Sequence, residues 1–162
     1  MRSTDRAACT LLVCIAALSL AACTSAPEKK ADTLPAAAPA SVKDDTSLLL
    51  TADRTAAKVV TDHLLGIPAW PGGTIGDYEA GGKKYQLFII ESDTAQDAAL
   101  LLLDAKGVMK DPAYISYMGG YFGAIDRGPL YVFAKTKYLA GVVGLSENKA
   151  DPLARRLAAQ LH

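Results

Sequence analysis

Cysteine is the scarcest informative residue in this 162-residue sequence, which has only Cys9, Cys14 and Cys23. The first two lie in an apolar N-terminal segment that we expect to be removed, so only Cys23 would remain in the mature chain. A single thiol cannot form an internal disulfide, and a thiolate metal site needs more than one cysteine. The mature domain is therefore expected to depend on its core alone for stability.

The sequence also has few histidines and no formal net charge. The histidines are His63 and His162, and 17 basic residues balance 17 acidic ones. His63 has no visible partner for a metal site or for acid–base chemistry. Basic residues cluster only in the pairs Lys29-Lys30, Lys83-Lys84 and Arg155-Arg156. Nucleic-acid binding requires a more concentrated basic surface, so the sequence predicts neither a metal site nor a nucleic-acid partner.

Catalytic motifs are missing too. The chain has no nucleophile elbow, Walker loop, dinucleotide-binding fingerprint or zinc-protease signature. The only candidates for acid–base chemistry are Glu91 with Asp93, and Asp126 with Arg127. Neither pair includes a histidine or a nucleophile. We therefore expect no catalytic residue and no cofactor, and we expect that the protein is not an enzyme.

The N-terminal segment has the pattern of a cleaved signal peptide. Arg2 and Arg6 precede an apolar run at residues 7–22. This run is shorter than the roughly 18 residues that a membrane-spanning helix needs. Short positive and apolar regions in this order are typical of export signals. We therefore predict that residues 1–22 are removed.

The end of this segment, Leu20-Ala21-Ala22-Cys23, resembles the lipobox of bacterial lipoproteins. The resemblance implies that the Cys23 thiol receives a diacylglyceryl group and that cleavage makes Cys23 the first mature residue. The protein would then be held to a cell membrane by lipid and would face the periplasm. Because Thr24 rather than an aspartate follows, similarity to the known sorting pattern favours the outer membrane in an organism with two membranes.

The composition divides the mature chain into a tether and one domain. Residues 23–46 contain Pro27, Pro35 and Pro39 and few bulky apolar side chains, so they cannot bury enough surface to offset the entropy of ordering. Residues 47–162 have the length and apolar content of a single small domain. We predict a flexible linker at 23–46 and one α+β domain at 47–162.

We expect the domain to be an antiparallel sheet of five to six strands with three helices packed on it. The helices are predicted at 52–65, between Asp93 and Gly107, and at 151–161. Strands are predicted at 74–79, 83–91, 114–118, 121–126, 130–135 and 138–145. Both faces of the 83–91 segment are apolar, which indicates a central strand covered on each side.

The aromatic residues leave two interpretations open. Trp70 either caps the core or anchors a ligand, and the tyrosines of residues 114–138 either pack across strands or surround a small pocket. In the ligand interpretation, Trp70, Tyr117 and Tyr121 are the candidate binding residues. The apolar run at residues 100–103 raises a similar choice, since the second helix is either deeply buried or offers a contact surface.

From Gly81 onward, the order of features resembles an uncharacterised family of exported bacterial proteins. The matching features are Gly81-Gly82 before a strand, Asp97-Ala98 in a helix, the Gly119-Gly120 turn, the aromatic strands around Tyr131 and Tyr138, and the closing helix. The family carries no known activity. We therefore hypothesise a non-enzymatic lipoprotein that binds an envelope protein, and the alternative is a periplasmic small-ligand binder or an accessory subunit of an envelope complex.

Overall fold

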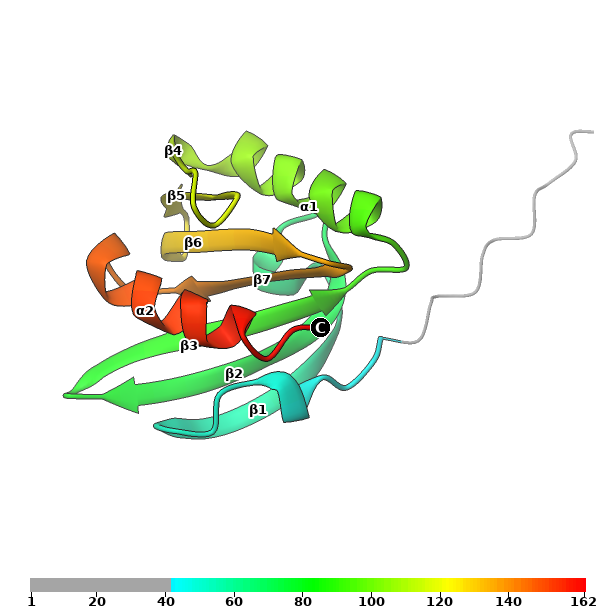
Figure 1. Ribbon diagram of the computed structural model, residues 1–162. Coiled ribbons are helices and arrows are strands. Elements are labelled where there is room, and N and C mark those ends of the chain that lie inside the picture. The colour runs from blue at the N-terminus through cyan, green and yellow to red at the C-terminus, as the bar shows by residue number, and fades with distance from the viewer. Residues whose placement is uncertain (1–41) are drawn as a thin grey trace, which may run out of the picture. The chain divides into compact units, whose positions relative to one another are not determined.

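The computed structural model describes residues 42–162, which form a seven-stranded antiparallel sheet and two α-helices (Figure 1). This confirms the α+β class. The strands are β1 (Arg54–Asp62), β2 (Pro71–Ala80), β3 (Lys83–Glu91), β4 (Lys110–Ile115), β5 (Gly120–Ile125), β6 (Gly128–Lys135) and β7 (Tyr138–Val143). The helices are α1 (Ala95–Val108) and α2 (Glu147–Ala158), and the short 3₁₀ turns η1 (Thr46–Leu48) and η2 (Leu64–Gly66) flank β1. The predicted signal peptide, Cys23 and linker residues up to 41 lie outside the described residues.

The sheet consists of two meanders joined by α1. Its strand order is β1-β2-β3-β7-β6-β5-β4. After β3, α1 carries the chain to the far edge, and β4 to β7 return until β7 pairs with β3. The tight β2–β3 turn is formed by Gly81 and Gly82, whose φ angles of 56° and 71° are readily adopted by glycine in a two-residue hairpin turn. The Gly81-Gly82 pair that precedes the strand in the sequence therefore forms its turn.

The two helices cover opposite faces of the sheet. Alternate residues of β3 enter different cores: Leu87 and Ile89 pack on the α2 side, and Phe88 and Ile90 pack on the α1 side. All four side chains are fully buried. This confirms the prediction that residues 83–91 form a central strand covered on both faces, and it gives the domain two separate apolar layers.

Strand β1 occupies the segment where a helix was predicted at 52–65, so that prediction is wrong. Four of its nine residues, Thr55, Val59, Val60 and Thr61, are β-branched and pack more easily on an extended backbone. Pairing with β2 adds to this preference. A Cβ atom on Gly72 would lie 2.2 Å from the Val60 carbonyl oxygen, so a glycine is needed for the strands to approach this closely.

The remaining predicted elements are present with shifted ends. β2 begins at Pro71 rather than at 74, because Gly72 and Gly73 extend the ladder with β1. β4 begins at Lys110 rather than at 114. With β1 included, the described residues contain seven strands rather than five to six, and two α-helices rather than three.

Helix α2 starts earlier than predicted. Its N-cap is Ser146, so Asp151, where the helix is expected to begin, lies inside the helix together with Pro152. Ala150 is fully buried before them, and burying it favours a helix that includes the preceding residues. As shown below, the Asp151 carboxylate has other partners.

Contacts of the domain extend into the last residues of the predicted linker. The Asp45 backbone N–H donates to Thr74 Oγ1 at 2.9 Å, and the Thr74 hydroxyl donates to the Lys43 carbonyl at 3.3 Å. Thr74 is fully buried in β2. Residues 43–45 are therefore attached to the sheet and can contribute to a site there.

Candidate functional site

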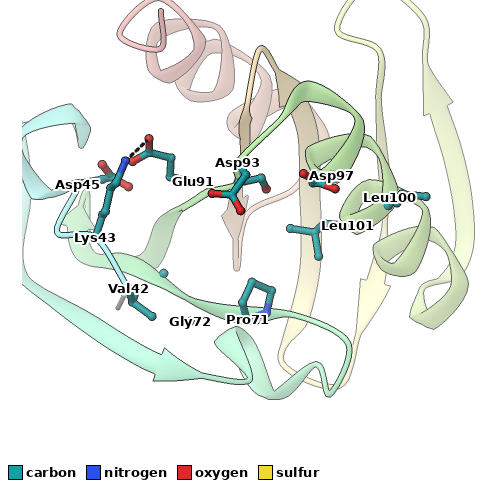
Figure 2. Close-up of a pocket in the computed structure, with 12 residues that line it drawn as sticks. Val42, Lys43, Asp45, Pro71, Gly72, Glu91, Asp93, Asp97, Leu100 and Leu101 are labelled. Atoms are coloured by element: carbon teal, nitrogen blue, oxygen red, sulfur yellow. Dashed lines mark hydrogen bonds and ion pairs between the residues drawn. The ribbon is translucent and has the colours of Figure 1, made fainter. Parts of the chain in front are cut away.

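A surface cleft of about 400 Å³ lies beside the N-terminal end of α1 (Figure 2). Segments far apart in the sequence meet there: residues 42–45, the start of β2, the end of β3 and the first turns of α1. We call this site the α1 cleft, and it is lined by Val42, Lys43, Asp45, Pro71, Gly72, Gly73, Glu91, Ser92, Asp93, Asp97, Leu100 and Leu101. Figure 2 shows Lys43, Asp45 and Glu91 together at one end, Leu100 and Leu101 toward the other, and Asp93 and Asp97 between them.

Glu91 is the centre of the charged end. Its carboxylate, with only 9% of the side chain exposed, accepts hydrogen bonds from Lys137 Nζ at 2.5 Å and Lys43 Nζ at 2.8 Å. These bonds hold the pKa of Glu91 below its ordinary value, and the same contact raises the pKa of Lys137. Glu91 therefore stays ionised near neutral pH and connects residue 43, β3 and the β6–β7 turn.

Asp45 lies close to this ion pair and responds in the opposite direction. Asp45 is 9% exposed. Its burial, and secondly the neighbouring negative charge of Glu91, raise the pKa of its carboxyl group. Neighbouring carboxyl groups with opposite pKa shifts occur in acid–base catalysis, but a reaction also requires a group positioned on a substrate. Glu91 is already bonded to two lysines, so its arrangement is that of a structural ion pair.

The first turn of α1 forms the middle of the cleft. Thr94 is its N-cap: Thr94 Oγ1 accepts from the Asp97 N–H at 3.1 Å, and Asp97 Oδ2 accepts from the Thr94 N–H at 3.1 Å. The threonine hydroxyl thus meets the N3 amide and the Asp97 carboxylate returns to the cap, which is the reciprocal pair of a capping box. Asp93 is left exposed on the cleft wall.

Ser92 contributes a buried hydroxyl to the wall. Its backbone N–H donates to the Lys137 carbonyl at 2.8 Å, but its Oγ atom has no hydrogen-bond partner among residues 42–162. With Asp45, Glu91, Asp93, Asp97 and two lysines nearby, the formal charge around the cleft is four negative against two positive. The charged end therefore suits a cationic group.

The apolar end continues onto the outer face of α1. Leu100 is 60% exposed and Leu103 is 54% exposed, whereas Leu102 on the inner face is 8% exposed. We call Leu100 and Leu103 the leucine surface. Of the two interpretations of the 100–103 run, deep burial therefore does not hold for Leu100 and Leu103.

Trp70, one of the candidate ligand residues, is part of the core. It is 1% exposed, its ring centroid lies 5.3 Å from that of Phe88, and Nε1 donates to the Leu101 carbonyl at 3.0 Å. The indole thus fastens α1 to the sheet. These contacts fit the core-capping interpretation of Trp70.

Tyr117 and Tyr121 lie apart, on opposite faces of the sheet. Tyr121 packs against the α1-side core with Lys106 Nζ 5.3 Å from its ring centroid. Tyr117 is 58% exposed, and the Arg155 guanidinium of α2 lies 4.3 Å above its ring. The structure therefore does not bring Trp70, Tyr117 and Tyr121 around one cavity.

A polar network around Asp151 was not recognised in the sequence. Asp151 Oδ1 accepts from the Tyr117 hydroxyl at 2.7 Å and the Tyr131 hydroxyl at 2.9 Å, while Oδ2 accepts from Arg155 Nε at 2.8 Å. Burial raises the pKa of Asp151, but these three hydrogen bonds lower it overall. Only the Asp151–Arg155 spacing of four residues on a helix gave a sequence signal. The network joins α2 to the sheet.

The remaining residues that the sequence suggested for acid–base or metal chemistry do not form one common site. Arg127 lines a different surface depression with Asp77 and Lys84, while Glu91 and Asp93 share the α1 cleft. His63 adopts a left-handed backbone conformation after β1, and its Nδ1 lies 3.1 Å from Asp62 Oδ2. No group of three or more His, Cys, Asp or Glu side chains within residues 42–162 is placed to hold a metal ion.

The chain matches no protein-family model, and no curated protein or solved structure is significantly similar to it. Neither helix of the 42–162 domain has both the length and the apolar character needed to cross a membrane.

Proposed function

We propose that the protein is a lipid-anchored lipoprotein of the cell envelope whose domain binds a protein partner and catalyses no reaction. The anchor is supported by Leu20-Ala21-Ala22-Cys23, with Cys23 as the lipidated residue. The mature protein faces the periplasm, from the outer membrane where the organism has two membranes.

The leucine surface beside the α1 cleft is the observation that carries the binding role. A leucine side chain gains about 1.5–3 kcal/mol when it is fully covered. Leu100 and Leu103 are both more than half exposed, so covering them together supplies a considerable driving force. An apolar patch beside charged groups has the composition of an interface core and its rim.

The exposed carboxylates in the middle of the cleft indicate the chemistry of the partner. A basic side chain of the partner could approach Asp93 and Asp97, which are exposed and have no salt bridge within the described domain. An apolar residue next to it would cover Leu100. We therefore infer a partner segment that carries lysine or arginine beside bulky apolar residues.

Photocrosslinking in cells tests partner binding. A photoreactive residue at position 103 of the full chain should form a defined crosslinked product. Leu100→Gln should abolish that product, whereas Asp104→Asn, an exposed change on the same helix, should keep it. Equal crosslinking from position 58 on β1, or persistence of the product in Leu100→Gln, would argue against the leucine surface as the binding site.

Metabolic labelling with a palmitate analogue tests the anchor separately. Cys23→Ser should lose the label and leave the membrane fraction, whereas Cys14→Ser, which also removes a cysteine, should keep both. Labelling that survives Cys23→Ser would place the lipid elsewhere. The crosslinking result is independent of this outcome, so the two parts of the proposal can fail separately.

A further inference from the structure

A second pocket of about 400 Å³ lies on the α2 side of the sheet, where the β2–β3 turn meets the start of α2. Three basic residues line it: Lys83 from β3, and Lys149 and Arg156 from α2. Asp53 is the one acidic residue of the lining. We call this site the α2 pocket, and its formal charge is three positive against one negative.

The three cations have no salt bridge within residues 42–162. The ion pairs of the described chain use Lys43, Lys137, His63 and Arg155 instead. Lys149 faces Lys83, whose contact and charge lower the pKa of Lys149. Two ammonium groups placed together repel each other, and Asp53 is the one acidic residue of the lining, so the arrangement favours an external negative group.

Lys149 also lies near the N-terminus of α2. It is the third residue of the helix, where the positive end of the helix dipole disfavours a cation, and Glu147 in the same turn offsets part of that dipole. A bound anion would relieve the repulsion between the two lysines and the remaining dipole charge.

The rest of the pocket is apolar. Leu145 and Tyr85 are buried at its base, and Leu153 and Pro152 of α2 form a wall. An anion alone would leave this wall exposed to water. A ligand whose charged group is attached to a ring or a short hydrocarbon group would cover it.

We propose that the α2 pocket binds a phosphate ester, with the phosphate held by Lys83, Lys149 and Arg156 and its apolar substituent against Leu153. A guanidinium group presents two parallel N–H donors to phosphate oxygens, and the two lysines supply point charges. The net charge of the lining matches a phosphate dianion. This inference is independent of partner binding at the leucine surface, which lies on the other face.

Calorimetric titration of the purified full chain with phenyl phosphate tests the assignment, with sodium chloride at matched ionic strength as the reference. Saturable binding is expected, and it should be stronger than binding of inorganic phosphate. Lys83→Gln and Arg156→Gln should each weaken it roughly tenfold, because each removes a charge-assisted hydrogen bond. Lys58→Gln, at an exposed lysine of β1, should have no effect.

Lipid headgroups also carry a phosphate ester, which in phosphatidylglycerol is a singly charged diester, so a vesicle arm separates the two sources. The fraction of protein that floats with vesicles should be compared between phosphatidylglycerol and phosphatidylcholine. An N-terminal lipid anchor would bind both kinds of vesicle, so only the difference between the two fractions reports on the α2 pocket. A preference for phosphatidylglycerol that phenyl phosphate and Lys83→Gln both abolish assigns the site to a lipid headgroup. Without that preference, saturable binding of phenyl phosphate assigns it to a soluble ester. Binding to neither, or binding that Lys83→Gln leaves unchanged, overturns the proposal.

Discussion

Three neighbouring leucines of α1 should respond very differently to substitution. Leu100 and Leu103 are 60% and 54% exposed, so replacing both with glutamine should change the free energy of unfolding by less than about 0.5 kcal/mol. Glutamine has nearly the helix propensity of leucine, so the helix itself is not weakened. Leu102 is 8% exposed and packs in the α1-side core, so Leu102→Ala should cost about 2–4 kcal/mol.

Urea unfolding followed by tryptophan fluorescence measures this difference directly. Trp70 is the only tryptophan, and its bond to the Leu101 carbonyl makes its signal sensitive to the docking of α1. The slope of the transition should stay constant among the variants, since the surface exposed on unfolding is similar. The midpoint should move only for Leu102→Ala.

A loss of more than about 1.5 kcal/mol in the Leu100→Gln, Leu103→Gln double variant would refute this reasoning, since surface substitutions rarely cost so much. It would mean that these side chains are covered in the isolated protein. If the wild-type transition then also depended on protein concentration, the cover would be a second copy of the chain. A concentration-independent loss would place the leucines in the core of the monomer.

Three further predictions concern the core and the ion pairs. Gly141→Ala would place a Cβ atom 2.2 Å from the Tyr131 carbonyl oxygen and should lower the free energy of unfolding by about 3 kcal/mol. Gly107→Ala, with open space around it in α1, should raise the free energy of unfolding by about 1 kcal/mol. Equal effects of the two substitutions in urea unfolding would contradict this account. The pKa of Glu91 is lowered on folding, so its contribution to stability exists above the unfolded pKa of about 4.3 and disappears as pH falls through the folded pKa. Glu91→Gln should therefore cost about 1 kcal/mol at neutral pH and nothing in strong acid, whereas Glu79→Gln, on an exposed residue of β2, should cost less than about 0.5 kcal/mol at neutral pH. Trp70→Phe should cost about 2 kcal/mol by circular dichroism, because it loses a hydrogen bond and core volume; an unchanged stability would favour a ligand-binding Trp70.

The parts of the fold that could be predicted are those where local sequence and tertiary contacts agree. Residues 83–91 alternate between two apolar faces, and Gly81-Gly82 fits the turn before them, so β3 was located correctly. The segment at 54–62 is different. Its residues are mostly exposed, so it has no buried stripe of either period, and its strand state depends on pairing with β2. A single sequence does not reveal such a partner.

The leucines of α1 show what composition alone leaves undecided. The run at 100–103 is compatible with a buried helix or with a contact surface, and the choice depends on which side of the helix faces the sheet. Ala98, Leu102 and Ala105 face inward, with spacings of four and three residues, and this leaves Leu100 and Leu103 outside. A hydrogen bond from Trp70, which is remote in the sequence, to the Leu101 carbonyl adds a contact to this packing that the helix sequence alone does not indicate.

The α1 cleft depends on strand register in the same way. Lys43 lies 48 residues before Glu91, and nothing between them predicts the ion pair. Lys137 reaches Glu91 because Glu91 is paired with Tyr138 across the β3–β7 ladder, which places the β6–β7 turn beside the end of β3. A slip of one residue in this ladder would direct Glu91 to the other face and separate it from both lysines. The charged end of the cleft is therefore a consequence of the central strand pairing, and a change that shifts this register should remove the ion pair and the site together.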